Sequence, residues 1–556
     1  MKLDPIVKKI LNKRGICAEA DIVEFLSDKP RKTYDPFLLP DMEAGVDLIL
    51  SETGKGSKIC VYGDYDADGI TSTVLMMTML SHLTSWENLS YYIPSRFEEG
   101  YGLNMEAVEQ IAAGGCDMII TVDCGSVSYE EAEYAKKLGM KILVIDHHNI
   151  TDKMADCLLI NPKRPDSSYP FRELAGCGVA FKVAQGLQKK AGLPKHTLTE
   201  VLDLAAIGTV GDIMPLLDEN RTITKYGLKV INMCPRPGLK KLIEGTSLKA
   251  GSISSGNISF VIVPHLNASG RIEDASQAVE LLLGRCPDEE MDMIVSDILQ
   301  KNIQRRKLQN ELFEELKKAV DKDAPDDFMI LESDGNHEGI AGIVAGKIKD
   351  AFYRPTVILS PTGDGDSLLK GTGRSIEGVD LYKVLKTQEH LFVKFGGHAG
   401  ACGFSMKKED LPLLKEGVSQ QMQKIKAENS RVFERKFDID MELSPGQMSV
   451  ELAQQMEMLA PFGNKNPRPL IECRPVHISN VRYMGSDGQH VRFYAAVGRS
   501  AKLECVLFNN AKKYDFTKLE KEDVNMVGNI ECHQWQGNMR LQFLAAEIQI
   551  DEQPGQ

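Results

Sequence analysis

The chain has 556 residues, of which 42% are hydrophobic and 26% charged, a composition typical of a globular protein with several domains. No apolar run approaches the roughly 18 residues of a membrane-spanning helix, and Lys8 and Lys9 interrupt the apolar stretch at the start, so neither a membrane protein nor a signal peptide is expected. The twelve cysteines form no CxxC pair, which argues against a zinc ribbon or a disulfide framework and favours the reducing cytoplasm. The net charge of −13 is not that of a typical nucleic-acid-binding protein, but it leaves room for an acidic metal site.

The first half of the chain predicts a parallel sheet. Residues 1–45 are expected to form short helices interrupted by prolines. Short runs rich in β-branched residues then alternate with helical stretches, at 58–63, 118–122 and 141–145. This alternation is typical of an α/β fold with a doubly wound parallel sheet.

The second half predicts three further parts. Residues from about 200 to 325 are mostly helical in pattern, and 288–320 could be one long connecting helix. A second α/β pattern follows between 326 and 426. Alternating apolar residues between 491 and 550 then predict a small antiparallel barrel.

Acidic residues and histidines follow each of the three early strands. The first strand is followed by Asp64, Asp66 and Asp68, the second by Asp123, the third by Asp146, His147 and His148, and Asp212 closes a later apolar stretch. Sites in open parallel sheets form at the carboxyl ends of the strands, so neighbouring strands would bring these side chains together. Crowded carboxylates need cations, and carboxylates with imidazole suit Mn²⁺ or Mg²⁺ in a phosphoester-hydrolysing centre of two ions.

Each of these residues also has an ordinary structural interpretation. An aspartate at a strand end is usually a helix N-cap, and adjacent histidines are usually surface residues. GDYDADGITS also resembles a calcium-binding aspartate ladder, although it lacks the downstream glutamate. The coincidence of the same chemistry at three strand ends favours the metal centre.

The motifs resemble a known family. GDYDADGITS, VDCG, DHH and TVGD occur in the order of the four motifs of the DHH phosphoesterase superfamily. NASGR, HEGIAGIVAGKI, GRS, GGHAGACG and PFGNKNPRP, from 267 to 469, are similar to motifs of the RecJ family of single-strand-specific exonucleases. The resemblance covers nearly the whole chain.

The resemblance implies a set of metal ligands. These would be Asp66, Asp68, Asp123, His147 and Asp212, with Asp64 as a ligand or an orienting residue. Asp146 is a further candidate ligand. His148 would bind metal, orient a ligand or the phosphate, or protonate the departing oxygen. The implied cofactor is Mn²⁺ or Mg²⁺, as two ions.

Substrate-binding residues are expected in the later motifs. Arg271 and Arg374 could hold phosphates, with Asn267 and Ser375 as neutral donors, although a surface salt bridge is the alternative for each arginine. Gly396 and Gly397 would let an anion approach the backbone beside His398, although an isolated glycine pair is usually a plain turn. Weaker candidates for DNA contact are the run 304–307 and the aromatic residues Phe493, Tyr494 and Trp535.

The resemblance also implies the domain organisation and the function. Expected are an N-terminal helical segment (1–45), a DHH catalytic domain (46–225), a helical region (226–325), a DHH-associated substrate-binding domain (326–430) and an OB-fold barrel (431–550). The implied activity is metal-dependent 5′→3′ exonucleolytic hydrolysis of single-stranded DNA to 5′-mononucleotides, in recombination and repair. A monomer assisted by a helicase and a single-strand-binding protein is expected. The alternatives are a DHH phosphoesterase of short oligonucleotides or cyclic dinucleotides, or a non-catalytic DNA-binding scaffold.

Overall fold

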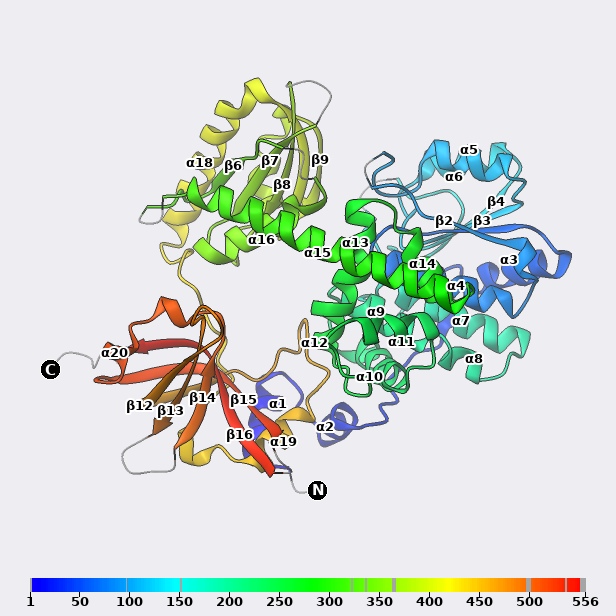
Figure 1. The fold of residues 1–556 in the computed structure, drawn as a ribbon. Helices are drawn as coiled ribbons and strands as arrows, with labels where there is room; N and C mark the ends of the chain where they lie inside the picture. Colours follow the sequence, from blue (N-terminus) through cyan, green and yellow to red (C-terminus); the bar gives the residue numbers. More distant parts are fainter. Residues whose placement is uncertain are drawn as a thin grey trace. The chain divides into compact units, whose positions relative to one another are not determined.

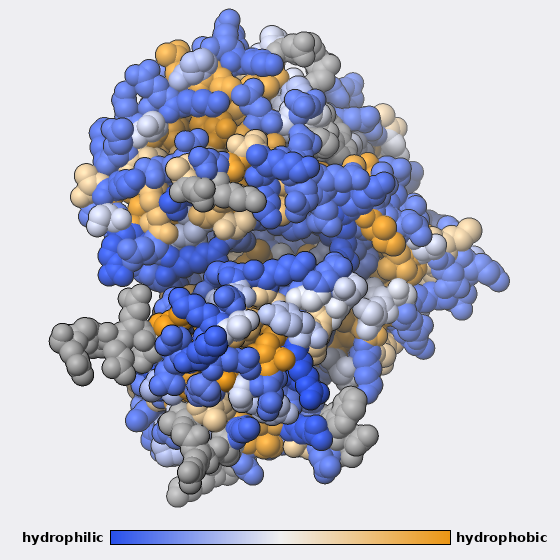
Figure 2. Space-filling view, turned by 60° about the vertical axis from the view of Figure 1, so that its left-hand side comes forward, coloured by the Kyte–Doolittle hydropathy of each residue, from blue (hydrophilic) through white to orange (hydrophobic). Residues whose placement is uncertain are grey.

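The computed structural model describes residues 3–96, 98–150, 153–321, 324–335, 338–362, 367–496, 502–535 and 538–550, the side chains of 534 and 535 excepted. The chain divides into two compact units, residues 1–94, 101–263 and 437–556 in one and 95–100 and 264–436 in the other, and each is described by itself. Element labels are those of Figure 1. Among the described helices, none combines the length and the apolar character needed to cross a bilayer. The face shown in Figure 2 is largely hydrophilic, with small hydrophobic patches between hydrophilic residues.

The first unit contains the predicted parallel sheet. Its five strands lie in the order β2-β1-β3-β4-β5, and all pairs are parallel. The strands are β1 (Ile59–Tyr62), β2 (Leu89–Tyr92), β3 (Met118–Val122), β4 (Lys141–Ile145) and β5 (Leu158–Ile160). Every residue of β1 and β3 is buried, as expected for strands covered on both faces.

Helices cover both faces of this sheet. Figure 1 shows α5 (Met105–Ala113) and α6 (Tyr129–Lys137) on one face and α3 (Met42–Lys55), α4 (Ala67–Ser81) and α7 (Gly176–Ala191) on the other. The chain continues through α8 (His196–Thr199), α9 (Leu202–Gly211), α10 (Asp218–Met233), α11 (Pro237–Gly245) and α12 (Ser255–Asn257). The apolar helix α9 is almost entirely buried, and it carries Asp212 at its C-terminal end.

The first unit also contains the predicted barrel. Its strands are β11 (Met441–Glu442), β12 (Ile471–Met484), β13 (His490–Ala496), β14 (Leu503–Leu507), β15 (Asp523–Trp535) and β16 (Asn538–Ile550). The sheet order ends in β14-β16-β15, and an additional β12–β15 pairing closes the barrel. The expected antiparallel barrel is confirmed for most pairs, but β11 pairs with β12 and β14 pairs with β16 in parallel.

The N-terminal helices belong to the core of the barrel region. Val7, Ile10 and Leu11 of α1 (Pro5–Lys13) and Ile22 and Phe25 of α2 (Glu19–Leu26) are buried in one cluster with barrel residues and with α19 (Val450–Glu457). The short helix α20 (Phe516–Leu519) contributes to the same cluster. The two ends of the sequence therefore share one hydrophobic core.

The second unit combines helices with a mixed sheet in the order β6-β7-β8-β10-β9. Its strands are β6 (Met329–Glu332), β7 (Thr356–Pro361), β8 (Leu368–Arg374), β9 (Phe392–His398) and β10 (Ala401–Lys407). Its helices are α13 (Val263–Ile272), α14 (Ser276–Leu283), α15 (Asp288–Lys318), α16 (Glu338–Phe352), α17 (Leu381–Lys386) and α18 (Leu411–Glu428). The predicted long helix is confirmed as α15, which has 31 residues.

Candidate metal centre

The strand register brings the acidic loops to one edge of the first sheet. Tyr62 at the end of β1 pairs with Thr121 of β3, and Val122 at the end of β3 pairs with Ile145 at the end of β4. Residues that follow these strand ends therefore start from neighbouring positions at the same edge. The sequence-based expectation that the three acidic motifs meet is confirmed by this order.

The loop after β1 feeds directly into α4. The Asp66 side chain is the N-cap of α4 and accepts hydrogen bonds from the backbone N–H groups of Asp68 (2.8 Å) and Gly69 (3.2 Å). The capping role that was the ordinary alternative for Asp66 is thus real, and both bonds are made to the same oxygen, Oδ1. Asp64 and Asp68 are buried.

A second helix N-terminus holds Asp68. Its two carboxylate oxygens accept hydrogen bonds from the backbone N–H groups of Gly176 (2.7 Å) and Cys177 (2.8 Å), in the first turn of α7. These N–H groups lack partners within the helix, so a carboxylate satisfies them and gains from the helix dipole. Glycine is required at this point because a Cβ on Gly176 would lie only 2.5 Å from Oδ1 of Asp123.

Three side chains converge on one point without hydrogen-bonding to one another. Nε2 of His147 lies 3.2 Å from Oδ1 of Asp123 and 3.6 Å from Oδ2 of Asp212. Both oxygens are buried, and neither makes a hydrogen bond to any residue that the structure describes. Buried carboxylate oxygens without donors are costly, so this arrangement fits a set of ligands for a cation.

The ligand atoms form three overlapping groups, each within a 4.8 Å spread. The groups are Asp64, Asp66 and Asp123; Asp68, His147 and Asp212; and Asp123, Asp146, His147 and His148. Asp123 belongs to two groups, and its backbone is in the left-handed region at φ 60°. Such a conformation in a non-glycine residue is strained and is often found at functional sites.

Asp146 differs from the other acids because donors surround it. One oxygen accepts from the backbone N–H of Ser126 (3.0 Å), and the other from the N–H of His147 (2.7 Å), the N–H of His148 (3.2 Å) and Nδ1 of His148 (2.8 Å). Although burial opposes the charged form, the hydrogen bond from His148 holds the pKa of Asp146 well below its usual range. Asp146 therefore has the environment of an orienting carboxylate.

The other acids repel one another. Burial, together with the charge of Asp66, raises the pKa of Asp68 to about 6, and burial with the charge of Asp68 raises the pKa of Asp212 to about 8. The pKa of Asp123 is also raised well above its usual value by burial and by the charge of Asp68. A divalent cation would remove this penalty by neutralising the carboxylates.

The two adjacent histidines have opposite protonation behaviour. Burial and the neighbouring charge of His148 lower the pKa of His147 to about 3, so its imidazole is neutral, the form that binds metal. Burial opposes protonation of His148, but its hydrogen bond to Asp146 raises the pKa to about 9. His148 is therefore a cation at neutral pH.

The sequence reasoning missed Tyr101. Its hydroxyl donates to the backbone oxygen of Asp123 (3.3 Å) and lies 3.1 Å from the imidazole of His148. No pattern in the sequence pointed to it, because a single tyrosine 22 and 47 residues from its two partners carries no spacing signal.

Both candidate arginines of the second unit lie against α16. Nη1 of Arg271 in α13 donates to the backbone oxygen of Gly339 (2.7 Å). A Cβ on Gly342 would lie 2.8 Å from Nη2 of Arg374, at the end of β8. Burial lowers the pKa of Arg374, and the described residues give it no carboxylate partner within ion-pair distance. The salt-bridge alternative therefore does not hold for Arg374.

The glycine-rich motif forms the β9–β10 hairpin. Ala401 of β10 pairs with both Arg374 and His398, so these two side chains start from the same end of the sheet. Gly396 has open space around its missing Cβ, which fits close approach of a ligand. Gly397 (φ 143°) instead packs on its own hairpin, since a Cβ there would lie 2.4 Å from the oxygen of Ala401.

The remaining candidates for substrate binding differ in their hydrogen bonding. Ser375 donates its hydroxyl to the oxygen of Val379 (2.7 Å), so that proton is already used. Oδ1 of Asn267 in α13 is buried and has no hydrogen-bond partner among the described residues. His337, at the start of the HEG-type motif, lies outside the described residues.

The weaker candidates for DNA contact differ in how accessible their side chains are. Arg305, in the run 304–307 of α15, bonds to Asn302 of the same helix (2.9 Å), so it is not a freely solvated charge. Phe493 is wrong as a DNA contact because it is fully buried in the barrel core. Tyr494 is half-buried, and the side chain of Trp535 lies outside the described part of the chain.

Comparison with known proteins follows this geometry. Three family models match: the DHH family N-terminal domain at 58–209, the DHHA1 domain at 326–424 and the RecJ OB domain at 439–547. The single-stranded-DNA-specific exonuclease RecJ of Bacillus subtilis is 35% identical over 99% of this chain and 69% of its own length. The enzyme of the same name from Escherichia coli is 31% identical over 98% of this chain and 96% of its own length.

A solved structure is also similar to this chain. RecJ from Thermus thermophilus in complex with Mn²⁺ matches with a TM-score of 0.81 and 25% identity, over 100% of this chain and 79% of the solved one. The full-length similarity, the three matching domains and the acidic centre lead to one conclusion: the chain belongs to the RecJ family of single-stranded-DNA-specific exonucleases.

Proposed function

We propose that this protein is a metal-dependent exonuclease that hydrolyses the phosphodiester bonds of single-stranded DNA and releases 5′-mononucleotides. The observation that carries the proposal is the convergence of His147 Nε2 on two buried carboxylate oxygens that have no hydrogen-bond donor in the described part of the chain. The relatives named as single-stranded-DNA-specific exonucleases supply the substrate class. We take the 5′→3′ direction from the resemblance of the motifs.

Two divalent ions, Mn²⁺ or Mg²⁺, fit the overlapping groups. The residues that would hold them are Asp64, Asp66, Asp68, Asp123, His147 and Asp212. Asp123 belongs to more than one group, so its carboxylate would help to hold both ions. When bound, the ions would supply water activation and neutralise charge on the phosphoryl oxygens.

Residues of the chain itself would orient the histidines and protonate the departing oxygen. Asp146 would fix both histidines through its hydrogen bonds to their backbone N–H groups. The cationic His148, hydrogen-bonded to Asp146, would donate a hydrogen bond to the phosphate or a proton to the departing 3′-oxygen. The hydroxyl of Tyr101, which lies 3.1 Å from each ring nitrogen of His148, would help to hold this imidazole.

The second unit would bind the strand. Arg374 and Arg271 would hold phosphates, with the side-chain amide N–H of Asn267, His398 and the open backbone at Gly396 as further contacts. The proposed domains are the helical segment (1–45), the catalytic domain (46–225), the helical region (226–325), the substrate-binding domain (326–430) and the OB-fold (431–550). We also propose that the protein acts as a cytoplasmic monomer, with a helicase and a single-strand-binding protein as partners.

The test is a nuclease assay on matched single- and double-stranded DNA with Mn²⁺. Asp68→Ala should abolish cleavage, because it removes one ligand and frees the first turn of α7. Glu130→Ala, which removes an exposed acid of α6, is the control and should cleave like the wild type. Cleavage that persists in Asp68→Ala, or in excess EDTA, would contradict the proposal.

A further inference from the structure

The motif PFGNKNPRP at 461–469 lies outside the metal centre in the sequence, yet it forms a structured turn. Gly463 and Asn466 exchange backbone hydrogen bonds of 2.9 and 3.1 Å, which makes a hairpin turn with Asn464 and Lys465 at its tip. Lys465, the third residue of the turn, takes the left-handed conformation at φ 58°, as in a type II turn.

The tip of this turn contacts the chain immediately after Asp212. Nδ2 of Asn464 donates to the backbone oxygen of Ile213 at 2.7 Å, across 251 residues of sequence. The backbone N–H of Leu216 donates to the oxygen of Asn464 at 2.9 Å. The turn therefore holds the segment 213–216 by one side-chain and one backbone hydrogen bond.

The residue that Asn464 holds is strained. Ile213 has a φ of 56°, although a β-branched side chain disfavours the left-handed region by about 1–2 kcal/mol. Its side chain is 68% exposed, so burial gives little compensation. The conformation is the C-terminal cap of α9, in which the N–H of Met214 donates to the oxygen of Thr209 (3.2 Å). The side chain of Asn464 donates a hydrogen bond to the backbone carbonyl of Ile213, the strained residue itself.

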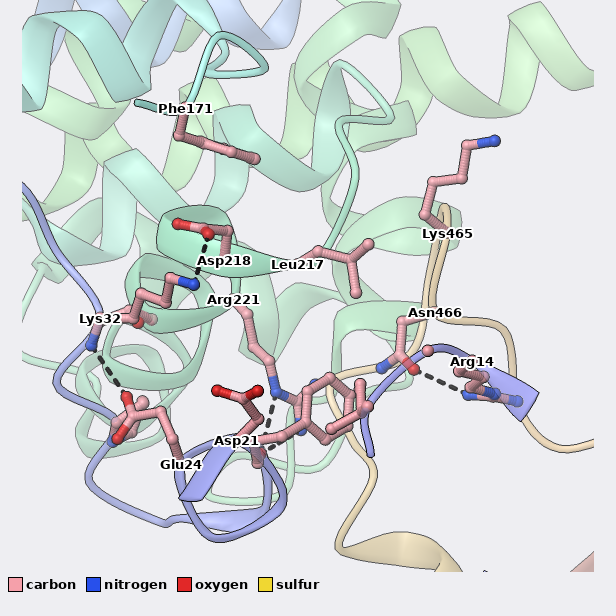
Figure 3. Close-up of a pocket in the computed structure, with 15 residues that line it drawn as sticks. Arg14, Asp21, Glu24, Lys32, Phe171, Leu217, Asp218, Arg221, Lys465 and Asn466 are labelled. Carbon is pink, nitrogen blue, oxygen red and sulfur yellow. Dashed lines mark hydrogen bonds and ion pairs between the residues drawn. The ribbon is translucent and has the colours of Figure 1, made fainter. Parts of the chain in front are cut away.

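The base of the turn is rigid. The buried Asn466 donates Nδ2 to the oxygens of Leu459 (2.9 Å) and Pro461 (2.8 Å), and its Oδ1 accepts from Nη1 of Arg14 (2.8 Å). Figure 3 shows this Arg14–Asn466 bond beside a cavity of about 430 Å³. Nη2 of Arg221 in α10 donates to the oxygen of Ala460 (2.8 Å) and fixes the start of the motif.

We propose that Asn464 is a positioning residue for the metal centre. By holding the carbonyl of Ile213, it keeps the end of α9 in the conformation that directs Asp212 toward His147. The inference rests on the proposed function, since it assigns Asp212 to metal binding. The proposal gives the motif at 461–469 a role in shaping the metal centre of the first unit, which is different from contacting DNA.

The test is direct measurement of Mn²⁺ binding, from the electron paramagnetic resonance signal of free Mn²⁺ during titration of the full chain. Asn464→Ala and the nearly isosteric Asn464→Asp both remove the donor but leave the backbone bond to Leu216. Both should weaken Mn²⁺ binding about tenfold, in the range found for residues that orient metal ligands. Lys465→Ala, at the other tip position, should bind Mn²⁺ like the wild type.

A second variant separates positioning from a general packing role. Ile213→Gly removes the strain, because glycine adopts the left-handed region freely. In that background, Asn464→Ala should cost clearly less Mn²⁺ affinity than it does in the wild type. Wild-type affinity in Asn464→Ala, or an equal loss with Ile213 and with Gly at 213, would overturn the inference. A wild-type protein that binds no Mn²⁺ would instead refute the proposed function itself.

Discussion

Gly176→Ala tests the geometry of the metal centre without removing any ligand. An added Cβ would lie 2.5 Å from Oδ1 and 2.8 Å from Cγ of Asp123, where ordinary contact begins at 3.4 Å. The carboxylate or the first turn of α7 must therefore move by up to about 0.9 Å, which is the difference between the first and last of these distances. A shift of the carboxylate displaces Asp123 itself, and a shift of the turn displaces Asp68, which accepts hydrogen bonds from that turn, so either movement disturbs a proposed ligand.

The expected consequence is large for so small a change. A displacement of about 1 Å at a reacting centre typically costs about 100-fold in rate, which is about 2.7 kcal/mol. Gly176→Ala should therefore bind Mn²⁺ more weakly and cleave single-stranded DNA about 100-fold more slowly in single-turnover conditions.

Gly178→Ala on the same helix is the matched control. Its added Cβ would meet the side chain of Leu174 at 3.4 Å, an ordinary contact, and alanine favours the helix. This variant should keep wild-type metal binding and unfold at an equal or higher temperature. Equal activity of Gly176→Ala and Gly178→Ala would refute the reasoning about the site.

Three further predictions concern charge. Lys182 and Glu219 form a buried ion pair of 2.7 Å, so Lys182→Met, which leaves the charge of Glu219 buried without its cation, should lower the free energy of unfolding in urea by about 3–5 kcal/mol. The double variant Lys182→Met with Glu219→Gln should restore most of this loss. In metal-free protein, Asp212→Asn should have a higher free energy of unfolding than the wild type at pH 8 but not at pH 4. The folded pKa of Asp212 is about 8 and lies above its unfolded value, so the wild-type protein loses stability as the pH rises above that unfolded value. A stability advantage that is equal at both pH values would contradict this. Asp146→Asn should lower the pKa of His148 from about 9, measured by NMR of the metal-free protein, and an unchanged value would exclude the assigned hydrogen bond as its cause.

The acidic edge of the sheet could be predicted because its cause is local. Short buried strands that alternate with helices predict parallel neighbours, and the carboxyl ends of such strands meet at one edge. Asp64, Asp123 and Asp146 lie within two residues of the ends of three such strands, so their convergence required only the strand order. The distinction between Asp146 and the other acids required the positions of backbone donors, which no sequence pattern gives.

Other features depend on pairings between distant segments. The parallel β14–β16 pair, which helps to close the barrel, joins strands that alternation alone does not orient. The same alternation left Phe493 equally compatible with the core and the surface. The contact of Asn464 with Ile213 joins a turn before the barrel to the end of α9. Such long-range contacts follow from the packing of complete domains.

The central claim is that the acidic centre cleaves single-stranded DNA from one end, and a time course on end-labelled strands tests it most directly. With Mn²⁺, the 5′ label should leave immediately as a mononucleotide while the 3′-labelled strand shortens stepwise, and Asp123→Ala should do neither. Turnover of a dinucleotide without cleavage of the long strand would contradict the claim in favour of a small-substrate phosphoesterase. DNA binding without any turnover would contradict it in favour of a scaffold.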